Sequence, residues 1–144
     1  DSSDSIHMST WPLGYLVAIW IAMEDIHPDC GPLEYYPRSH RLPYLFSHKI
    51  DRQPRDLQHK RTSWYNEVYE DEIEGIVVKE NIGKKFLLAK KGDLLIWHAN
   101  LIHGGSPRHD KRLSRKALVA HYFGKGAFCY GDRNEMFCDP YQAE

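Results

Sequence analysis

The sequence predicts a mainly β fold, an antiparallel barrel or jelly roll, with one amphipathic helix inserted among the strands. Two observations support this prediction. Short segments rich in branched and aromatic residues recur along the chain and are joined by short turns, whereas only one segment repeats its apolar residues at helical steps. With 144 residues, the chain has the length of one domain, so we expect residues 1–144 to form a single domain.

The expected strands are bounded by turn residues. Gly14 precedes the first strand, which is rich in Ile, Val and aromatic residues, and Pro37 ends the second because proline cannot donate to a strand ladder. A Lys-Lys-Gly-Asp turn separates the third strand from the fourth. The full set of expected strands is 14–25, 33–36, 86–89, 94–97, 117–123 and 127–130.

The one helical pattern begins near Ser63 and ends near 81–83. Apolar residues recur there at three- and four-residue steps with acidic residues between them, and Thr62 or Ser63 is the expected N-cap. The preceding residues, 38–62, are polar, contain two prolines and lack periodicity. We expect a long surface loop there that acts as a lid.

Composition excludes several classes of function. Nineteen Lys and Arg residues stand against twenty acidic residues, a formal net charge of −1, which argues against nucleic-acid and anionic-membrane binding. The longest apolar run, 15–23, is too short to cross a bilayer. Three cysteines without metal-type spacing make a disulfide framework improbable and favour a reducing, cytoplasmic location.

Two residues of the C-terminal half are candidates for chemistry. His103 follows an apolar strand and precedes two glycines, and Arg115 leads the next apolar strand. An imidazole suits a divalent metal and a guanidinium binds a carboxylate through two hydrogen bonds, so both could face one cavity. We expect Arg115 to be partly buried and to point into the barrel. The spacing leaves an alternative open, in which His103 is an ordinary loop histidine and Arg115 is a surface charge.

The N-terminal segment adds a carboxylate. Asp4 lies just before an expected strand, with Ser2 two positions earlier and His7 three positions later. Many iron oxygenases hold Fe(II) with two histidines and one carboxylate. On its own the segment is a weak signal, because residues two apart on a strand share a face and Ser2 is not a histidine.

Four segments taken together are more specific. They resemble, in order and spacing, the phytanoyl-CoA dioxygenase family of Fe(II)- and 2-oxoglutarate-dependent oxygenases. The segments are SSDSIHMST (2–10), VAIWIAMEDIHPDCGPLEYYPRSH (17–40), GDLLIWHANLIHGGSP (92–107) and SRKALVAHYF (114–123).

The resemblance implies both a fold and a set of roles. The fold is a double-stranded β-helix, with the metal between two antiparallel sheets. Asp4 and His103 are the implied iron ligands and should lie close together in space. Arg115 is implied to bind the far carboxylate of 2-oxoglutarate, and Trp20 to line the cosubstrate pocket. The implied activity is hydroxylation of a small organic substrate.

The chain departs from the family pattern at two positions. Ser2 stands where the family has its first iron histidine, so one of three protein ligands is absent and Fe(II) affinity should fall. Arg38 stands where the family usually has glycine, and a positive φ there would cost about 1 kcal/mol or more.

The beginning of the chain supports a further expectation. Because it opens without an initiator Met and resembles the family from its first residues on, we expect it to be the C-terminal, catalytic-core part of such a protein. A strand edge left exposed by the absence of an N-terminal part would favour a homo-oligomer.

Three hypotheses therefore remain open. The first is an active oxygenase that uses Fe(II) and 2-oxoglutarate. The second is a family remnant that has lost its metal and serves as a binding or structural domain, which Ser2 favours. The third is a metal-binding jelly roll of the cupin kind, whose metal binding would not respond to 2-oxoglutarate.

Overall fold

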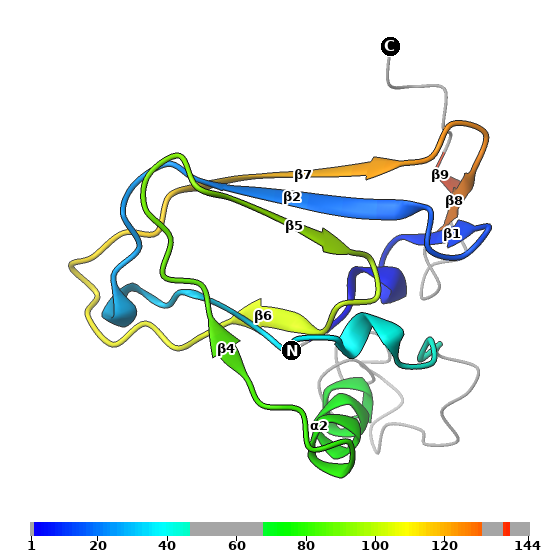
Figure 1. Cartoon of the computed structure of the whole chain (residues 1–144), viewed down its shortest axis with the longest axis horizontal. Helices are drawn as coiled ribbons and strands as arrows, with labels where there is room; N and C mark the ends of the chain where they lie inside the picture. Colours follow the sequence, from blue (N-terminus) through cyan, green and yellow to red (C-terminus); the bar gives the residue numbers. More distant parts are fainter. Residues whose placement is uncertain (1, 47–67, 131–136, 139–144) are drawn as a thin grey trace, which may run out of the picture.

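The computed structural model describes residues 2–46, 68–130 and 137–138 (Figure 1). The strands are β1 (Ser9–Trp11), β2 (Leu16–Ala22), β3 (Leu33–Tyr35), β4 (Lys85–Phe86), β5 (Leu94–His98), β6 (His103–Gly105), β7 (Ala117–Phe123), β8 (Phe128–Tyr130) and β9 (Phe137–Cys138). The helices are α2 (Glu70–Lys79) and three 3-10 turns, Asp4–Ile6, Pro28–Cys30 and Ser39–Arg41.

The strands form three antiparallel sheets of three strands each, in the orders β5-β2-β7, β4-β3-β6 and β1-β8-β9. Figure 1 shows the β5-β2-β7 sheet as one layer, with β4 and β6 in the layer facing it. A core cluster lies between these layers and includes residues from β2, β3 and β5. The prediction of a mainly β protein is confirmed.

β2 is the central strand of the larger sheet, and its sequence explains this position. Leu16, Ala18, Trp20 and Ala22 are buried, while the residues between them are exposed or half-buried. This period of two is the signature of a strand with one face on the core. Both neighbours pair with β2 over nearly its whole length, so β2 fixes their register.

The predicted strands are present with different ends. β7 spans the predicted residues 117–123, whereas β2 is shorter than 14–25 and the strand expected over 86–89 is limited to Lys85–Phe86. β1, β6 and β9 were not predicted. They have two or three residues each, and β6 contains two glycines, so they carry little local signal.

α2 covers the lower side of the fold in Figure 1. Its Ile73 and Val77 are buried in a second cluster that includes Ile6 and Ile102, which ties the helix to the start of the chain and to the loop before β6. The expected helix start at 62–63 and residues 47–62 of the expected lid lie outside the described residues. No helix within the described part of the chain is long and apolar enough to cross a membrane.

Candidate metal centre

The start of the chain is joined to β6 by a short backbone bridge. The Ser2 N–H donates to the His103 carbonyl and the His103 N–H donates to the Ser2 carbonyl, both at 2.9 Å. Asp4 then opens a 3-10 turn rather than a strand, which turns its side chain toward the sheets. As a result, Asp4 Oδ1 lies 3.5 Å from His103 Nε2. The expected proximity of these two side chains is observed.

One hydrogen bond determines which His103 nitrogen is available. Nδ1 lies 2.9 Å from the Leu101 carbonyl. Because a carbonyl oxygen only accepts, this contact places the hydrogen on Nδ1 and leaves the lone pair of a neutral ring on Nε2. Nε2 is the nitrogen that faces Asp4, so the imidazole has the tautomer that a metal ligand needs.

The second oxygen of Asp4 is held by Trp97. The indole Nε1–H of Trp97 donates to Asp4 Oδ2 at 2.8 Å, and Asp4 is only 8% exposed. The Trp97 ring also lies against the His103 ring, with centroids 4.8 Å apart. Trp97 therefore orients both candidate ligands, as hydrogen-bond donors around metal ligands commonly do.

A third imidazole reaches the same carboxylate. His121 Nε2, on β7, lies 3.3 Å from Asp4 Oδ2. The resemblance assigned His121 no role, but β7 carries a signal that would have found it. Ala117, Val119 and His121 alternate on the strand face that meets the buried side of β2, which is the face predicted for Arg115.

Buried hydroxyls and an amide anchor the turn that carries Asp4. Ser3 Oγ lies 2.8 Å from Ser5 Oγ, and Ser5 Oγ donates to Asn100 Oδ1 at 3.1 Å. Asn100 in turn donates its Nδ2–H to the Leu42 carbonyl at 2.8 Å. Because Ser5 and Asn100, and Asn100 and Leu42, are far apart in sequence, the position of the turn that carries Asp4 depends on tertiary structure.

Arg115 departs from its expected burial. It is exposed, so the prediction that it is partly buried is wrong. The physical reason is that its nearest neighbours include two glycines, which have no side chains to cover it. Its Nη1–H donates to the Gly31 carbonyl at 2.6 Å, and a Cβ at Gly105 would lie 3.5 Å from Nη1. From the loop before β7, the guanidinium therefore reaches toward β6, near Gly105, which is two residues after His103.

Trp20 lies in the core. It is 4% exposed and packs in the same cluster as Trp97, Leu33 and Leu101. This position is between the sheets, but no polar contact marks it as part of a pocket. Its role in lining a cosubstrate pocket stays a prediction.

The donor atoms around Asp4 fit the chemistry of a divalent metal. A carboxylate and two imidazoles are the donor set of many non-haem iron sites, and His121 Nε2 is a buried ring nitrogen without a hydrogen bond. As they stand, the described residues contain no group of three or more His, Cys, Asp or Glu side chains arranged to hold a metal ion. The pair formed by Asp4 and His103 is therefore the centre of the candidate site.

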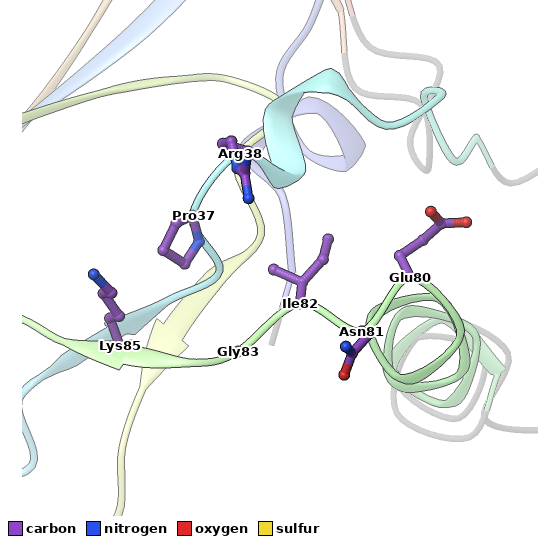
Figure 2. A pocket seen from close by; sticks show the side chains of 7 residues that line it. All are labelled: Pro37, Arg38, Glu80, Asn81, Ile82, Gly83 and Lys85. Carbon is purple, nitrogen blue, oxygen red and sulfur yellow. The ribbon is translucent and has the colours of Figure 1, made fainter.

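A hollow of about 660 Å³ lies at the end of α2 (Figure 2). It is lined by Pro37, Arg38, Glu80, Asn81, Ile82, Gly83 and Lys85, and by none of the expected site residues. Arg38 has a φ of 68°, the left-handed region that favours the glycine usual in the family at this position.

The structure is thus a β protein with a carboxylate and two imidazoles close together between two facing antiparallel sheets. The family model described as phytanoyl-CoA dioxygenase (PhyH) matches residues 2–117. The chain belongs to the phytanoyl-CoA dioxygenase family, as its four segments predicted. None of the curated proteins matches the chain in sequence.

One solved structure shows a similar fold. The epimerase SnoN from nogalamycin biosynthesis, described as non-heme and alpha-ketoglutarate dependent, is 17% identical and has a TM-score of 0.55. The match covers 88% of this chain and 41% of SnoN. The carbocyclase SnoK from the same biosynthesis is 19% identical over 83% of this chain and 39% of its own, with a TM-score of 0.48. The chain spans about two-fifths of the length of these proteins, and its architecture is jelly-roll-like.

Proposed function

We propose that this chain forms the metal-binding core of an Fe(II)- and 2-oxoglutarate-dependent oxygenase that acts on a small organic molecule. The observation that carries the proposal is the approach of Asp4 Oδ1 to His103 Nε2, at 3.5 Å, in a buried position between two sheets. Membership of the family and the fold shared with an alpha-ketoglutarate-dependent enzyme support it.

Each residue has a distinct task in this proposal. Asp4 and His103 hold the metal, and Trp97 keeps the carboxylate oriented through its Nε1–H. The bound Fe(II) and 2-oxoglutarate supply the oxygen activation that amino acid side chains lack. Arg115 binds the carboxylate of 2-oxoglutarate that is remote from the metal, and exchanges its present Gly31 carbonyl for that stronger, charged partner.

The hydrophobic core also contributes to the proposed function. Trp20 forms part of the apolar wall between the sheets, next to Trp97 in the same cluster. An apolar wall excludes water and strengthens the electrostatic contacts of a bound anion. A cytoplasmic location agrees with the buried thiol of Cys30.

Position 2 determines how tightly the centre holds its metal. Ser2 and His103 are a directly opposed pair in an antiparallel bridge, and such residues project their side chains to the same side. An imidazole at position 2 would therefore lie beside His103. Serine offers a neutral hydroxyl instead, so the affinity for Fe(II) is lower than in relatives with the complete motif.

The test is an anaerobic titration of the purified chain with Co(II), with and without 2-oxoglutarate, followed by calorimetry. Asp4→Asn should lower the affinity by more than about 100-fold, because losing only an outer hydrogen bond to a metal ligand already costs 10- to 100-fold. The amide still accepts from Trp97, so the fold should survive. Glu80→Gln, an exposed carboxylate in the hollow of Figure 2, is the matched control.

Three outcomes separate the hypotheses. Binding that Asp4→Asn removes and 2-oxoglutarate strengthens supports the oxygenase. Binding indifferent to 2-oxoglutarate indicates a cupin-like metal protein. Equal affinities of the wild type and Asp4→Asn would refute the centre and leave a family member without a metal.

A further inference from the structure

We propose that His121 is the third protein ligand of this metal centre and replaces the imidazole that Ser2 does not provide. The inference rests on the proposed function, since it concerns the same metal. It goes further by assigning a ligand role to a residue to which the resemblance gives none and which lies on a different strand from His103.

The first support is an unsatisfied atom. His121 Nε2 is buried and makes no hydrogen bond to any described residue, although it lies 3.3 Å from Asp4 Oδ2. Buried ring nitrogens are nearly always satisfied, because an unmade hydrogen bond costs stability. His121 Nε2 is close to the Asp4 carboxylate but does not form a hydrogen bond with it. Its lone pair can therefore bind another kind of partner. A metal ion is such a partner.

The second support is the register of the β5-β2-β7 sheet. Ala18 on β2 pairs with Trp97 on one side and with His121 on the other. All three residues therefore lie in one row across the inner face of the sheet, with neighbouring strands about 4.8 Å apart. Ala18 is fully buried and small, so the two large side chains can lean over it toward the same Asp4 oxygen.

The third support is the distance between donors. Atoms that bind one divalent ion at about 2.1 Å lie about 3 Å apart when they are neighbours in an octahedron. Asp4 Oδ1 lies 3.5 Å from His103 Nε2, and Asp4 Oδ2 lies 3.3 Å from His121 Nε2, so each imidazole is close to that separation from one oxygen of the carboxylate. Metal binding has to move these side chains, since the described residues do not form a ready three-ligand group as they stand.

The other candidate for the third ligand is less suitable. His7 is close to Asp4 in sequence, but its side chain is exposed, whereas His121 points between the sheets. The 3-10 turn explains the difference, because it buries Asp4 to Ile6 and leaves His7 outside. Of these two histidines, only His121 brings a ring nitrogen to the Asp4 carboxylate.

The experiment measures Co(II) binding to the full chain by calorimetry and by visible absorption, whose band positions and intensities report the donors and geometry around cobalt. His121→Ala should lower the affinity at least tenfold and change the absorption bands. His109→Ala, at an exposed histidine, is the matched control and should change neither. Circular dichroism and melting without metal show whether each variant folds.

A rescue variant distinguishes a ligand from a merely structural residue. In the double variant Ser2→His, His121→Ala, the new imidazole lies beside His103 and should restore most of the lost affinity. His121→Gln retains a polar side chain of similar reach, and should also fold but bind cobalt weakly. If His121 only supported the fold, a histidine at position 2 would not restore the cobalt affinity that His121→Ala loses.

The failures of the two proposals look different. If His121→Ala binds cobalt as the wild type does while Asp4→Asn does not, the metal centre stands and His121 is not its ligand. If the wild type binds no cobalt but Ser2→His does, the present inference is overturned and the centre needs the family's own histidine. If neither binds, both proposals fail.

Discussion

The metal centre and the hollow at the end of α2 both contain charged groups, but they are built in opposite ways. Around Asp4, three buried or half-buried side chains from remote segments meet within 3.5 Å of one carboxylate. Around the hollow, Arg38, Glu80 and Lys85 are exposed, and Figure 2 shows their side chains separated along its rim.

The difference teaches that free volume alone does not identify the functional site of this chain. The hollow is large, but solvent can satisfy its charges, so little stability depends on what occupies it. Around Asp4 the polar side chains are largely buried, and His121 Nε2 makes no hydrogen bond to any described residue. Buried polar groups need a reason to be retained, and a bound ion would provide one.

The largest expected effect tests which region binds the cosubstrate. Arg115→Ala should abolish the increase in Co(II) affinity caused by 2-oxoglutarate, because the remote carboxylate loses its charged partner. Arg38→Ala removes a guanidinium from the hollow and should leave that increase intact. Both are measured by paired titrations with and without 2-oxoglutarate. The opposite result would assign the cosubstrate to the hollow and break the comparison.

A smaller effect is expected at Trp97. Trp97→Phe keeps an aromatic ring but removes the donor to Asp4 Oδ2, so metal affinity should fall about 10- to 100-fold. The free energy of unfolding should fall by about 1–3 kcal/mol, since a buried carboxylate loses a hydrogen bond. Chelator competition and urea unfolding measure the two quantities.

The control for that substitution is Trp11→Phe, at a tryptophan that is 63% exposed. It should alter neither metal affinity nor stability appreciably. If Trp97→Phe lost stability but kept its affinity, Trp97 would be a packing residue and would not position Asp4.

The smallest effect concerns the hollow itself. Arg38→Gly should raise the free energy of unfolding by less than about 1 kcal/mol, because glycine adopts a φ of 68° without strain but loses more entropy on folding. Arg41→Gly, three residues later in the 3-10 turn, has no positive φ to relieve and should be destabilising. Urea unfolding compares them. A loss of stability in Arg38→Gly would show that the guanidinium makes contacts that outweigh the strain.

The sequence by itself predicted most of the strands, the family and a set of candidate site residues. Alternation of apolar residues predicted β2 and β7, and four short segments predicted the family and, through it, the candidates Asp4, His103 and Arg115 and a glycine position at Arg38. Such features are local. A period of two assigns residues to faces of a strand, and a glycine position implies a backbone angle, without knowledge of the neighbouring strand.

Only the tertiary structure decided which of these side chains meet. The bridge between Ser2 and His103 brings the two ends of the site together, and the pairing of Ala18 with both Trp97 and His121 turns two further side chains toward Asp4. Register is set by hydrogen bonds between strands that are far apart in the chain, so local patterns do not contain it. For the same reason, the sequence predicted a partly buried Arg115, but the glycines beside it leave it exposed.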